Sequence, residues 1–223
     1  MESHRKACLK QQTELRRVLA RPDPYDQAVR LLLSQHAVLH SAQMAGSESW
    51  SFEDEVFSNL TVEQARQIPR NGEHSVAWLV WHMARCEDIT MNLLVAGSPQ
   101  ILLRDNWLGR LKVTVRDTGN TMDGHEMANF SNTVDIEALR AYRMAVGRRT
   151  REVILQLQPA DLKRKVRATD LQQVRDEGAV VAAADGIAQY WGKRDVAGLL
   201  LMPATRHNLV HLNEALEIKR KLR

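Results

Sequence analysis

The sequence predicts an all-α protein, built as a helical bundle, and three observations support this prediction. Apolar residues recur at steps of three and four along several long segments, which is the period of an amphipathic helix. Serine, threonine or aspartate precedes many of these segments, and glycine or proline follows them, as helix boundaries require. Alternation typical of a strand is confined to residues 112–116, and one short strand does not change the fold class.

The N-terminal segment, residues 1–24, is predicted to be an arm that belongs to the domain or packs on it. The segment is polar and basic with few apolar residues, so a helix there has little to bury. Pro22 and Pro24 stop such a helix, because proline removes a backbone donor and restricts the residue before it. Residues 25–223 form the predicted bundle domain.

The first helix of the bundle is expected to start at Tyr25, capped by Asp23, and to end near Gly46. Residues 51–60 read as a short helix or turn. Thr61 follows with the spacing of a capping box, in which the residue three positions later is glutamate or glutamine.

The second helix is the most apolar of the chain; Ser75 can cap it, and Gly97 ends it. Two further helical segments are predicted at residues 135–158 and 169–190, the second with a weak point at Gly178. A short helix or turn follows at 195–202. Pro203 either kinks this segment or starts the last helix, which continues through Glu217. Residues 100–132, which contain the possible strand, are the least readable part.

Charge and cysteine content exclude several classes of protein. The net charge of +4 comes from 31 basic and 27 acidic residues, and the basic runs 148–151 and 163–165 contain few aromatics. Such runs are typical of solvated helix faces, so we expect no nucleic-acid partner. Cys8 and Cys86 cannot make a disulfide framework and fit a reducing compartment. No signal peptide and no apolar run of about 20 residues is present, so we expect a cytoplasmic protein without membrane spans.

The eight histidines point to metal chemistry. His207 and His211 are four residues apart, so on a helix both imidazoles lie on one face and can share an ion. Glu214 falls on the same face. A second pair with this spacing, His36 and His40, shows that the pattern alone is not specific.

A third histidine, His82, lies in the most apolar helix, flanked at four-residue steps by Trp78 and Cys86. It therefore belongs to the stripe expected to face the bundle interior, where metal sites of bundles are built. Three neutral imidazoles leave coordination positions open, which is typical of a catalytic rather than a structural site. The other histidines lie in the arm or in loops and are expected to face solvent: His4, His74 and His125.

Alternative catalytic schemes lack their motifs. The sequence contains no HExxH, no phosphate-binding glycine loop and no GxSxG. The Glu-x-x-His pairs of a di-iron bundle are also missing.

Two segments resemble a known family. Residues 75–88 (SVAWLVWHMARCED) look like the second-helix motif of the DinB-like superfamily, and residues 202–214 (MPATRHNLVHLNE) look like its last-helix motif. Residues 135–142 and 190–193 also match, and the resemblance extends over roughly residues 25–220. It implies an up-down-down-up four-helix bundle, here with extra short helices and the N-terminal arm, and a homodimer.

The resemblance also implies a divalent metal ion, zinc or nickel, held by three histidines that map onto His82, His207 and His211. Characterised relatives include S-transferases and isomerases that use low-molecular-weight thiols, and hydrolases. We therefore expect a metal site that activates water or a thiol. The candidate groups around it, of unknown role, are Glu214, Asp88, Glu87 and, on the substrate side, His40.

A second interpretation stays open. The same residues fit a non-catalytic bundle in which a metal ion stabilises a dimer or a partner-binding stress protein. A closed site with a fourth protein ligand, such as Cys86, would favour this interpretation, and an open position in an accessible cavity would favour an enzyme. The sequence names neither the substrate nor the reaction.

Overall fold

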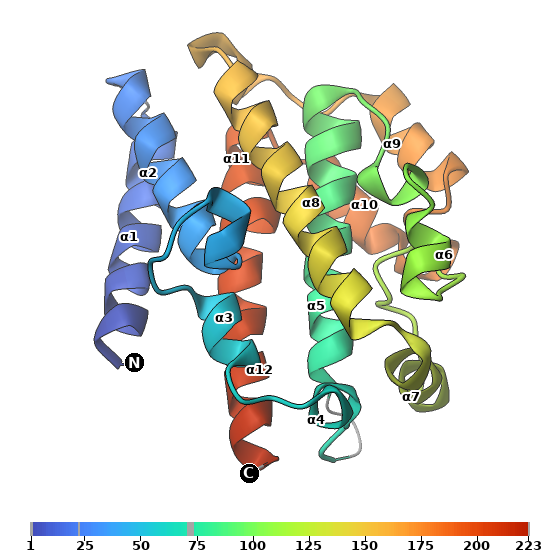
Figure 1. The fold of residues 1–223 in the computed structure, drawn as a ribbon. Helices are drawn as coiled ribbons and strands as arrows, with labels where there is room; N and C mark the ends of the chain where they lie inside the picture. Colours follow the sequence, from blue (N-terminus) through green and yellow to red (C-terminus); the bar gives the residue numbers. More distant parts are fainter. Residues whose placement is uncertain (1, 22, 71–73, 223) are drawn as a thin grey trace.

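The computed structural model describes residues 2–21, 23–70 and 74–222, and this part of the chain is helical without a β-strand (Figure 1). The all-α prediction is therefore confirmed. The long helices are α1 (Glu2–Ala20), α2 (Tyr25–Leu39), α5 (Val76–Asp88), α8 (Ile136–Gln156) and α12 (His207–Lys221). The shorter ones are α3 (Phe52–Phe57), α4 (Val62–Arg66), α6 (Trp107–Leu111), α7 (Gly124–Thr133), α9 (Ala168–Asp176), α10 (Asp185–Gly192) and α11 (Val196–Leu201).

Helix α5 is the centre of the fold, since it packs against α8 and α12 and every one of its residues is buried. The hydroxyl of Ser75 accepts a hydrogen bond from the Trp78 amide, as the capping pattern predicts. In Figure 1, α5 and α8 both run upward, whereas α2 and α12 run downward. A helix that is buried on all sides must also satisfy its charged side chains internally, and α5 carries Arg85, Glu87 and Asp88 fully buried.

Two helices of the bundle contain π-helical turns. One, η2 (Ile89–Ala96), continues α5 up to Gly97, whose φ of +61° suits glycine and ends the helix. The other, η6 (Met202–Arg206), contains Pro203 and joins α11 directly to α12. Such turns shift the register of side chains on a helix and are frequent at functional sites.

The prediction that a helix in the N-terminal arm has little to bury is wrong, because α1 buries several apolar side chains. Its residues Cys8, Leu15 and Leu19 are buried, and Leu15 packs in a core cluster with Leu32 of α2. The few apolar residues of this segment lie at helical spacing, so they form one narrow stripe that α2 and α11 cover.

Other differences concern boundaries. Helix α2 ends at Leu39, and a 3₁₀ turn, η1 (Ala42–Ala45), leads to Gly46. Pro24 itself occupies the N-cap position of α2, so Asp23 does not cap it. The segment 169–190 is two helices, because Gly178 adopts a φ of +65° between α9 and α10. The capping box at Thr61 is confirmed, with Gln64 as its second member.

The strand predicted at residues 112–116 is wrong. Lys112 caps the end of α6, and residues 113–116 run in irregular conformation because no second strand is present in the described residues to pair with them. The backbone carbonyl groups of residues 116–118, at the end of this segment and just after it, lie along α5. They accept hydrogen bonds from the side chains of Arg85, Trp81 and His82.

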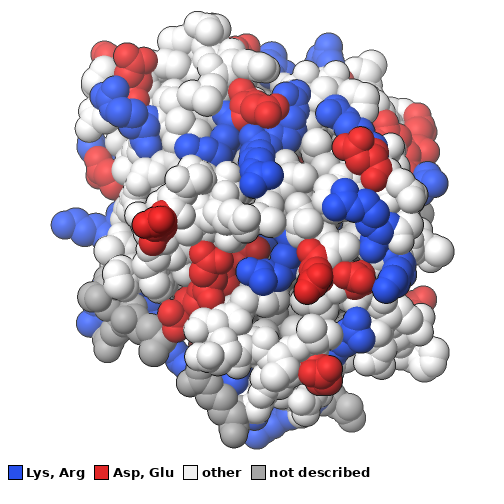
Figure 2. Space-filling model, viewed as in Figure 1, with Lys and Arg blue, Asp and Glu red and all other residues white. Residues whose placement is uncertain are grey.

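The basic runs are engaged within the molecule. Arg149 pairs with Glu152, Arg151 donates to the Leu33 carbonyl, and Arg164 donates to the Val95 carbonyl. Figure 2 shows basic and acidic side chains interspersed on the face it displays. Among the described residues, no helix combines the length and the apolar character needed to cross a membrane.

Candidate metal centre

His82 is held in one orientation and one tautomer. Its Nδ1 lies 2.8 Å from the carbonyl oxygen of Thr118, which can only accept, so Nδ1 carries the proton. The lone pair of Nε2 is therefore available to a ligand. The ring also stacks on Trp78, with centroids 4.8 Å apart and planes 6° from parallel, which restricts its rotation. Burial lowers the pKa of His82 to about 4, so the imidazole is neutral at pH 7.

His207 and His211 come from the first turns of α12, immediately after η6. Burial lowers the pKa of His207 well below its ordinary value. The Nδ1 of His211 lies 2.9 Å from Oε2 of Glu214. Burial alone would raise the pKa of Glu214, but hydrogen bonds from His211 and His74 outweigh it and lower the pKa to about 2. The ionised carboxylate accepts from Nδ1–H of His211, so in the neutral ring Nε2 is the nitrogen available to a ligand.

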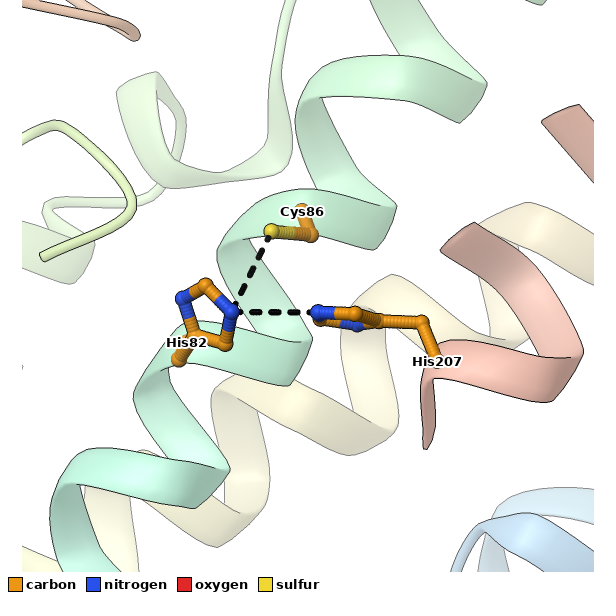
Figure 3. A group of neighbouring side chains, drawn as sticks. All are labelled: His82, Cys86 and His207. Carbon is orange, nitrogen blue, oxygen red and sulfur yellow. Dashed lines mark hydrogen bonds between the residues drawn. The ribbon is translucent and has the colours of Figure 1, made fainter. Parts of the chain in front are cut away.

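The three rings converge between α5 and α12. The centroids lie 4.8 Å apart for His82 and His207, 5.0 Å for His82 and His211, and 4.5 Å for His207 and His211. The Nε2 atoms of His82 and His207 are 3.0 Å apart and point toward each other (Figure 3). The nitrogen atoms of His82 and His207, two of the three histidines predicted to be ligands, thus face each other. The ring of His211 lies beside both, but its nitrogen atoms are not part of the close group of donor atoms.

Cys86 adds a sulfur donor to this group. It lies one helical turn after His82, with its Sγ 3.9 Å from Nε2 of His82 (Figure 3). The donor atoms of His82, Cys86 and His207 all lie within 4.8 Å of one another. Burial raises the pKa of the Cys86 thiol to about 12, so without a metal ion it stays protonated and is a poor nucleophile.

This donor set fits a divalent metal ion. Two nitrogen atoms bound at about 2.0–2.1 Å to one tetrahedral ion lie about 3.3 Å apart, close to the separation of the two Nε2 atoms. Neutral imidazoles are the protonation state that a metal ion requires. Nδ1 of His82 and of His211 donates to an oxygen atom, as ligating histidines usually do.

A cavity of about 240 Å³ opens onto two of the histidines, His82 and His207. It is also lined by Cys86, by Asn120 and by apolar and aromatic side chains of α10 and η6. These are Ile187, Tyr190, Trp191, Met202 and Pro203. A small molecule in this cavity would therefore meet the histidine nitrogens at one end and an apolar wall elsewhere.

A second, larger hollow of about 570 Å³ adjoins the cavity, since Tyr190 and Met202 line both. Its described lining carries three arginines, Arg16, Arg194 and Arg206, and no carboxylate. The guanidinium of Arg194 lies over the ring of Tyr190 at 4.3 Å. We call this hollow the arginine groove.

Glu214 and His74 lie at the outer side of the centre. Glu214 bridges His211 and His74, with Oε1 2.6 Å from Nδ1 of His74. His74 stacks on Trp78 at 4.1 Å, and Trp78 stacks in turn on His82. The expectation that His74 faces solvent is met only in part, because its side chain is 30% exposed while its ring stacks on Trp78. His125 is exposed as expected.

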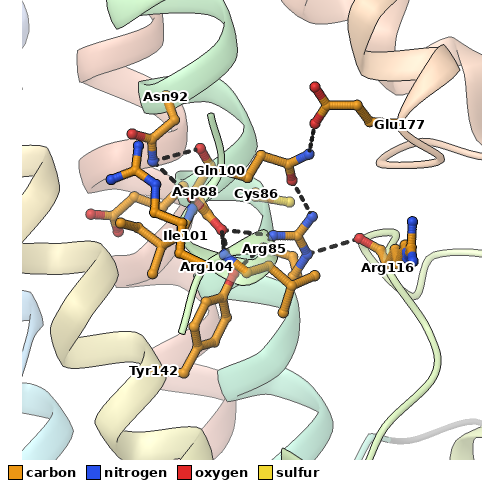
Figure 4. A network of polar contacts seen from close by, with 12 residues as sticks. Arg85, Cys86, Asp88, Asn92, Gln100, Ile101, Arg104, Arg116, Tyr142 and Glu177 are labelled. Carbon is orange, nitrogen blue, oxygen red and sulfur yellow. Dashed lines mark hydrogen bonds and ion pairs between the residues drawn. The ribbon is translucent and has the colours of Figure 1, made fainter. Parts of the chain in front are cut away.

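Asp88 lies away from the three histidines, in a buried polar network (Figure 4). Its carboxylate accepts hydrogen bonds from Arg85, Tyr142 and Asn92, and from two backbone amides after Gln100. Arg85 in turn donates to the carbonyl of Arg116. This network joins α5, α8 and the segment before α6, so its role is structural.

His40 and Glu87 also lie outside the three-histidine group. Both are fully buried, and Nε2 of His40 is 3.1 Å from Oε2 of Glu87. His36 contacts the other carboxylate oxygen, so the histidine pair of α2 has an acidic partner on α5. Sequence reasoning placed Glu87 near His82 and did not connect it with α2.

Thr118 was not predicted to belong to the site. It acts through its backbone carbonyl, which any residue type provides, so no side-chain motif could reveal it.

Comparisons with known proteins find a matching family and a similar fold. A family model of the DinB superfamily matches residues 45–215. Among solved structures, the chain is similar to one described as the conserved protein of locus from Enterococcus faecalis. The sequence identity is 19% and the TM-score 0.60, over 87% of this chain and 96% of the other. At this identity the likeness shows the fold alone. No curated protein matches the sequence.

Proposed function

Because the chain belongs to the DinB superfamily, we propose that it is a metal-dependent enzyme whose divalent ion is held by His82, His207 and His211. One observation carries the proposal: the three rings meet beside a cavity that a small molecule can enter. An ion with three protein ligands keeps a position open toward such a cavity, as catalytic zinc sites do. Zinc and nickel are the ions we expect, since imidazole suits both.

When bound, the ion would lower the pKa of water or of a substrate thiol and so supply a nucleophile near neutral pH. The residues of the chain prepare the site for this chemistry. The Thr118 carbonyl and the Glu214 carboxylate fix which nitrogen of His82 and His211 is free. The apolar wall formed by Ile187, Trp191 and neighbouring residues limits the access of water.

The two adjoining hollows favour an amphipathic, anionic substrate or co-substrate. Its reacting group would lie in the cavity at the histidines, and its negatively charged part would lie in the arginine groove, near Arg16 and Arg206. A low-molecular-weight thiol with carboxylate groups has this distribution of charge. Arginine pairs with carboxylates in a bidentate manner, which would orient the molecule.

A metal site of purely structural function is the second candidate, and Cys86 is the observation that favours it. A cysteine sulfur within reach of the histidine nitrogens offers a fourth ligand and thus a closed site. In that case the ion would stabilise the contact between α5 and α12, and the bundle would act as a homodimer or as a partner-binding protein. Sedimentation analysis of the purified protein tests the dimer, which we expect for either candidate.

Elemental analysis of the purified full-length chain tests the metal site. We expect a divalent ion bound in wild type and the metal content lower by one equivalent in His82→Ala. His125→Ala, which removes an exposed histidine, is the matched control and should retain the ion. A wild-type protein without metal after growth in metal-replete medium would contradict the proposal.

Access to the cavity separates the enzyme from the structural site. Gly186 of α10 lines the cavity, and a Cβ at this position meets no atom within 4 Å. We expect Gly186→Leu to fill the cavity and Gly186→Ala to leave it open, both with the metal retained. In cobalt-substituted protein, glutathione as the probe should change the visible absorption of wild type and Gly186→Ala but not of Gly186→Leu. A spectrum of wild type that glutathione leaves unchanged would favour the structural site.

A further inference from the structure

A second cluster of metal-ligating side chains lies behind the first centre. His36 and His40 of α2 meet Glu87 of α5 and Asn208 of α12, and the side chains of His36, His40 and Glu87 have no exposed surface. Nε2 of His36 is 2.7 Å from Oε1 of Glu87, and Nε2 of His40 is 3.1 Å from Oε2. Nδ2 of Asn208 is 2.8 Å from the same Oε2. Three helices thus bring two imidazoles, one carboxylate and one amide to one point.

The cluster holds one carboxylate and no lysine or arginine. The described hydrogen-bond partners of the Glu87 carboxylate are His36, His40 and Asn208. Arg143 of α8, which donates to the Leu39 carbonyl, pairs with Glu53 at 2.7 Å instead. Burial of a carboxylate is costly, and a bound cation offsets that cost.

Polar atoms without partners surround the same carboxylate. Nδ1 of His36, Nδ1 of His40 and Oδ1 of Asn208 are buried and make no hydrogen bond. Buried polar atoms without partners are costly, and native proteins contain few of them. Asn208 holds the carboxylate from the side of α12, because its Nδ2 donates both to Oε2 of Glu87 and to the Ala204 carbonyl.

The packing of α8 keeps His40 in place. A Cβ on Gly147 would lie 2.8 Å from Nδ1 and 3.0 Å from Cε1 of His40, so only glycine lets the imidazole occupy this position. The ring of His36 lies beside it, with centroids 4.3 Å apart. Both Nε2 atoms therefore stay directed at the same carboxylate.

We propose that His36, His40 and Glu87 form a second metal site for a divalent transition-metal ion such as zinc, with Asn208 hydrogen-bonded to the carboxylate. Two imidazole nitrogens and the carboxylate oxygens of Glu87 are a set that zinc accepts. All of them come from the protein and lie out of contact with solvent, so the site is closed and structural. The site joins α2 to α5 and α12, and α5 and α12 also carry the residues of the first centre. His36 and His40 precede residues 45–215, the part that the superfamily model matches.

Metal stoichiometry of the full chain, measured by native mass spectrometry after reconstitution with zinc, tests the proposal. Wild type should bind two ions, and His82→Ala and Glu87→Gln should each bind one. The double variant should bind none. Glu217→Gln, which changes an exposed glutamate of α12, is the matched control and should bind two. A wild type that binds one ion and a Glu87→Gln variant that retains it would overturn the second site.

Anomalous diffraction from crystals of the zinc-loaded wild type locates the ions even where a variant does not fold. The expected result is a peak between His36, His40 and Glu87. A water molecule or no peak at this position would overturn the proposal. The two centres can fail separately, because a peak at His82 and His207 without one at Glu87 supports the first centre alone, and the reverse supports the second.

Discussion

The Nε2 atoms of His82 and His207 lie 3.0 Å apart, although 125 positions of the chain separate the two residues. Different contacts position the two residues. A hydrogen bond to Thr118 and stacking on Trp78 orient the ring of His82, and the π-helical segment η6 leads directly to His207 at the start of α12. These contacts all lie within the chain and hold the two imidazoles in position for an ion. Little conformational entropy is then lost when an ion binds.

The role of Cys86 can be separated from that of the histidines. With three histidine ligands, Cys86→Ala should retain one equivalent of metal at the first centre, whereas His207→Ala should lose it. Substitution with cobalt provides the measurement, because a cysteine thiolate bound to cobalt absorbs strongly in the near ultraviolet. Absence of this absorption in wild type agrees with three histidines. Its presence in wild type and loss in Cys86→Ala would assign the sulfur as a fourth ligand and favour the structural role.

The turn at Gly119 should control metal affinity from outside the ligand set. Gly119 has a φ of +79°, and a Cβ there would lie 2.9 Å from Nε1 of Trp78. Gly119→Ala should therefore displace the neighbouring Thr118 carbonyl from His82. Loss of such a supporting contact typically lowers metal affinity 10–100-fold. Competition with a chelator measures the change. Gly124→Ala, where a Cβ meets no atom within 4 Å, should leave the affinity unaltered.

Helix α1 should contribute strongly to stability. Leu15 is fully buried, so Leu15→Ala should lower the free energy of unfolding by about 2–5 kcal/mol through lost burial and the cavity left behind. Leu9 lies on the same helix with 54% of its surface exposed, and Leu9→Ala should change stability by less than about 0.5 kcal/mol. Urea denaturation followed by circular dichroism compares the two. Equal, small effects would show that α1 does not fold together with the rest.

The buried pair of Arg85 and Asp88 should be far more important than a surface pair of the same spacing. Arg85→Met leaves Asp88 without its cationic partner inside the protein, and removing one member of a buried pair costs about 3–5 kcal/mol. Glu14 and Arg17 are also three residues apart but exposed, so Arg17→Met should leave the denaturant midpoint close to that of wild type. Denaturant midpoints of both variants provide the test. A similar midpoint for both would contradict a structural role of the network.

Alkaline pH should destabilise the protein through Cys8. Burial raises the pKa of this thiol from 9.0 to about 11, partly offset by the hydrogen bond from Gln35. Because the folded-state pKa is the higher one, the contribution of the neutral thiol is complete below pH 9 and is lost as pH rises through 11. The expected loss is about 3 kcal/mol, the free energy that corresponds to a change in pKa from 9.0 to about 11.

Comparison with Cys8→Ala isolates this contribution, because the variant lacks the titrating group. The difference in unfolding free energy between wild type and variant should shrink by that amount over the same pH range. A difference that stays constant above pH 9 would show that the thiol does not titrate on unfolding.

Local sequence determined much of this fold. Helical periodicity and capping residues such as Ser75 and Asp135 are properties of adjacent positions, and the structure bears them out. The strand at 112–116 was wrong because alternation shows only a potential for pairing, and pairing needs a partner that this chain does not place there. The split of 169–190 follows from the backbone of Gly178, whose effect the sequence indicated only as a weak point.

The sequence by itself determined which residues can carry metal chemistry, because the spacing of His207 and His211 and the apolar surroundings of His82 are local facts. Only the tertiary structure decided their partners. Packing of the irregular segment at Thr118 on α5 selects the tautomer of His82, and the meeting of α2 with α5 pairs His36 and His40 with Glu87. The two residues in each of these contacts are separated by 36 to 51 positions in the sequence. Such long-range contacts follow from the packing of the whole chain rather than from any local pattern.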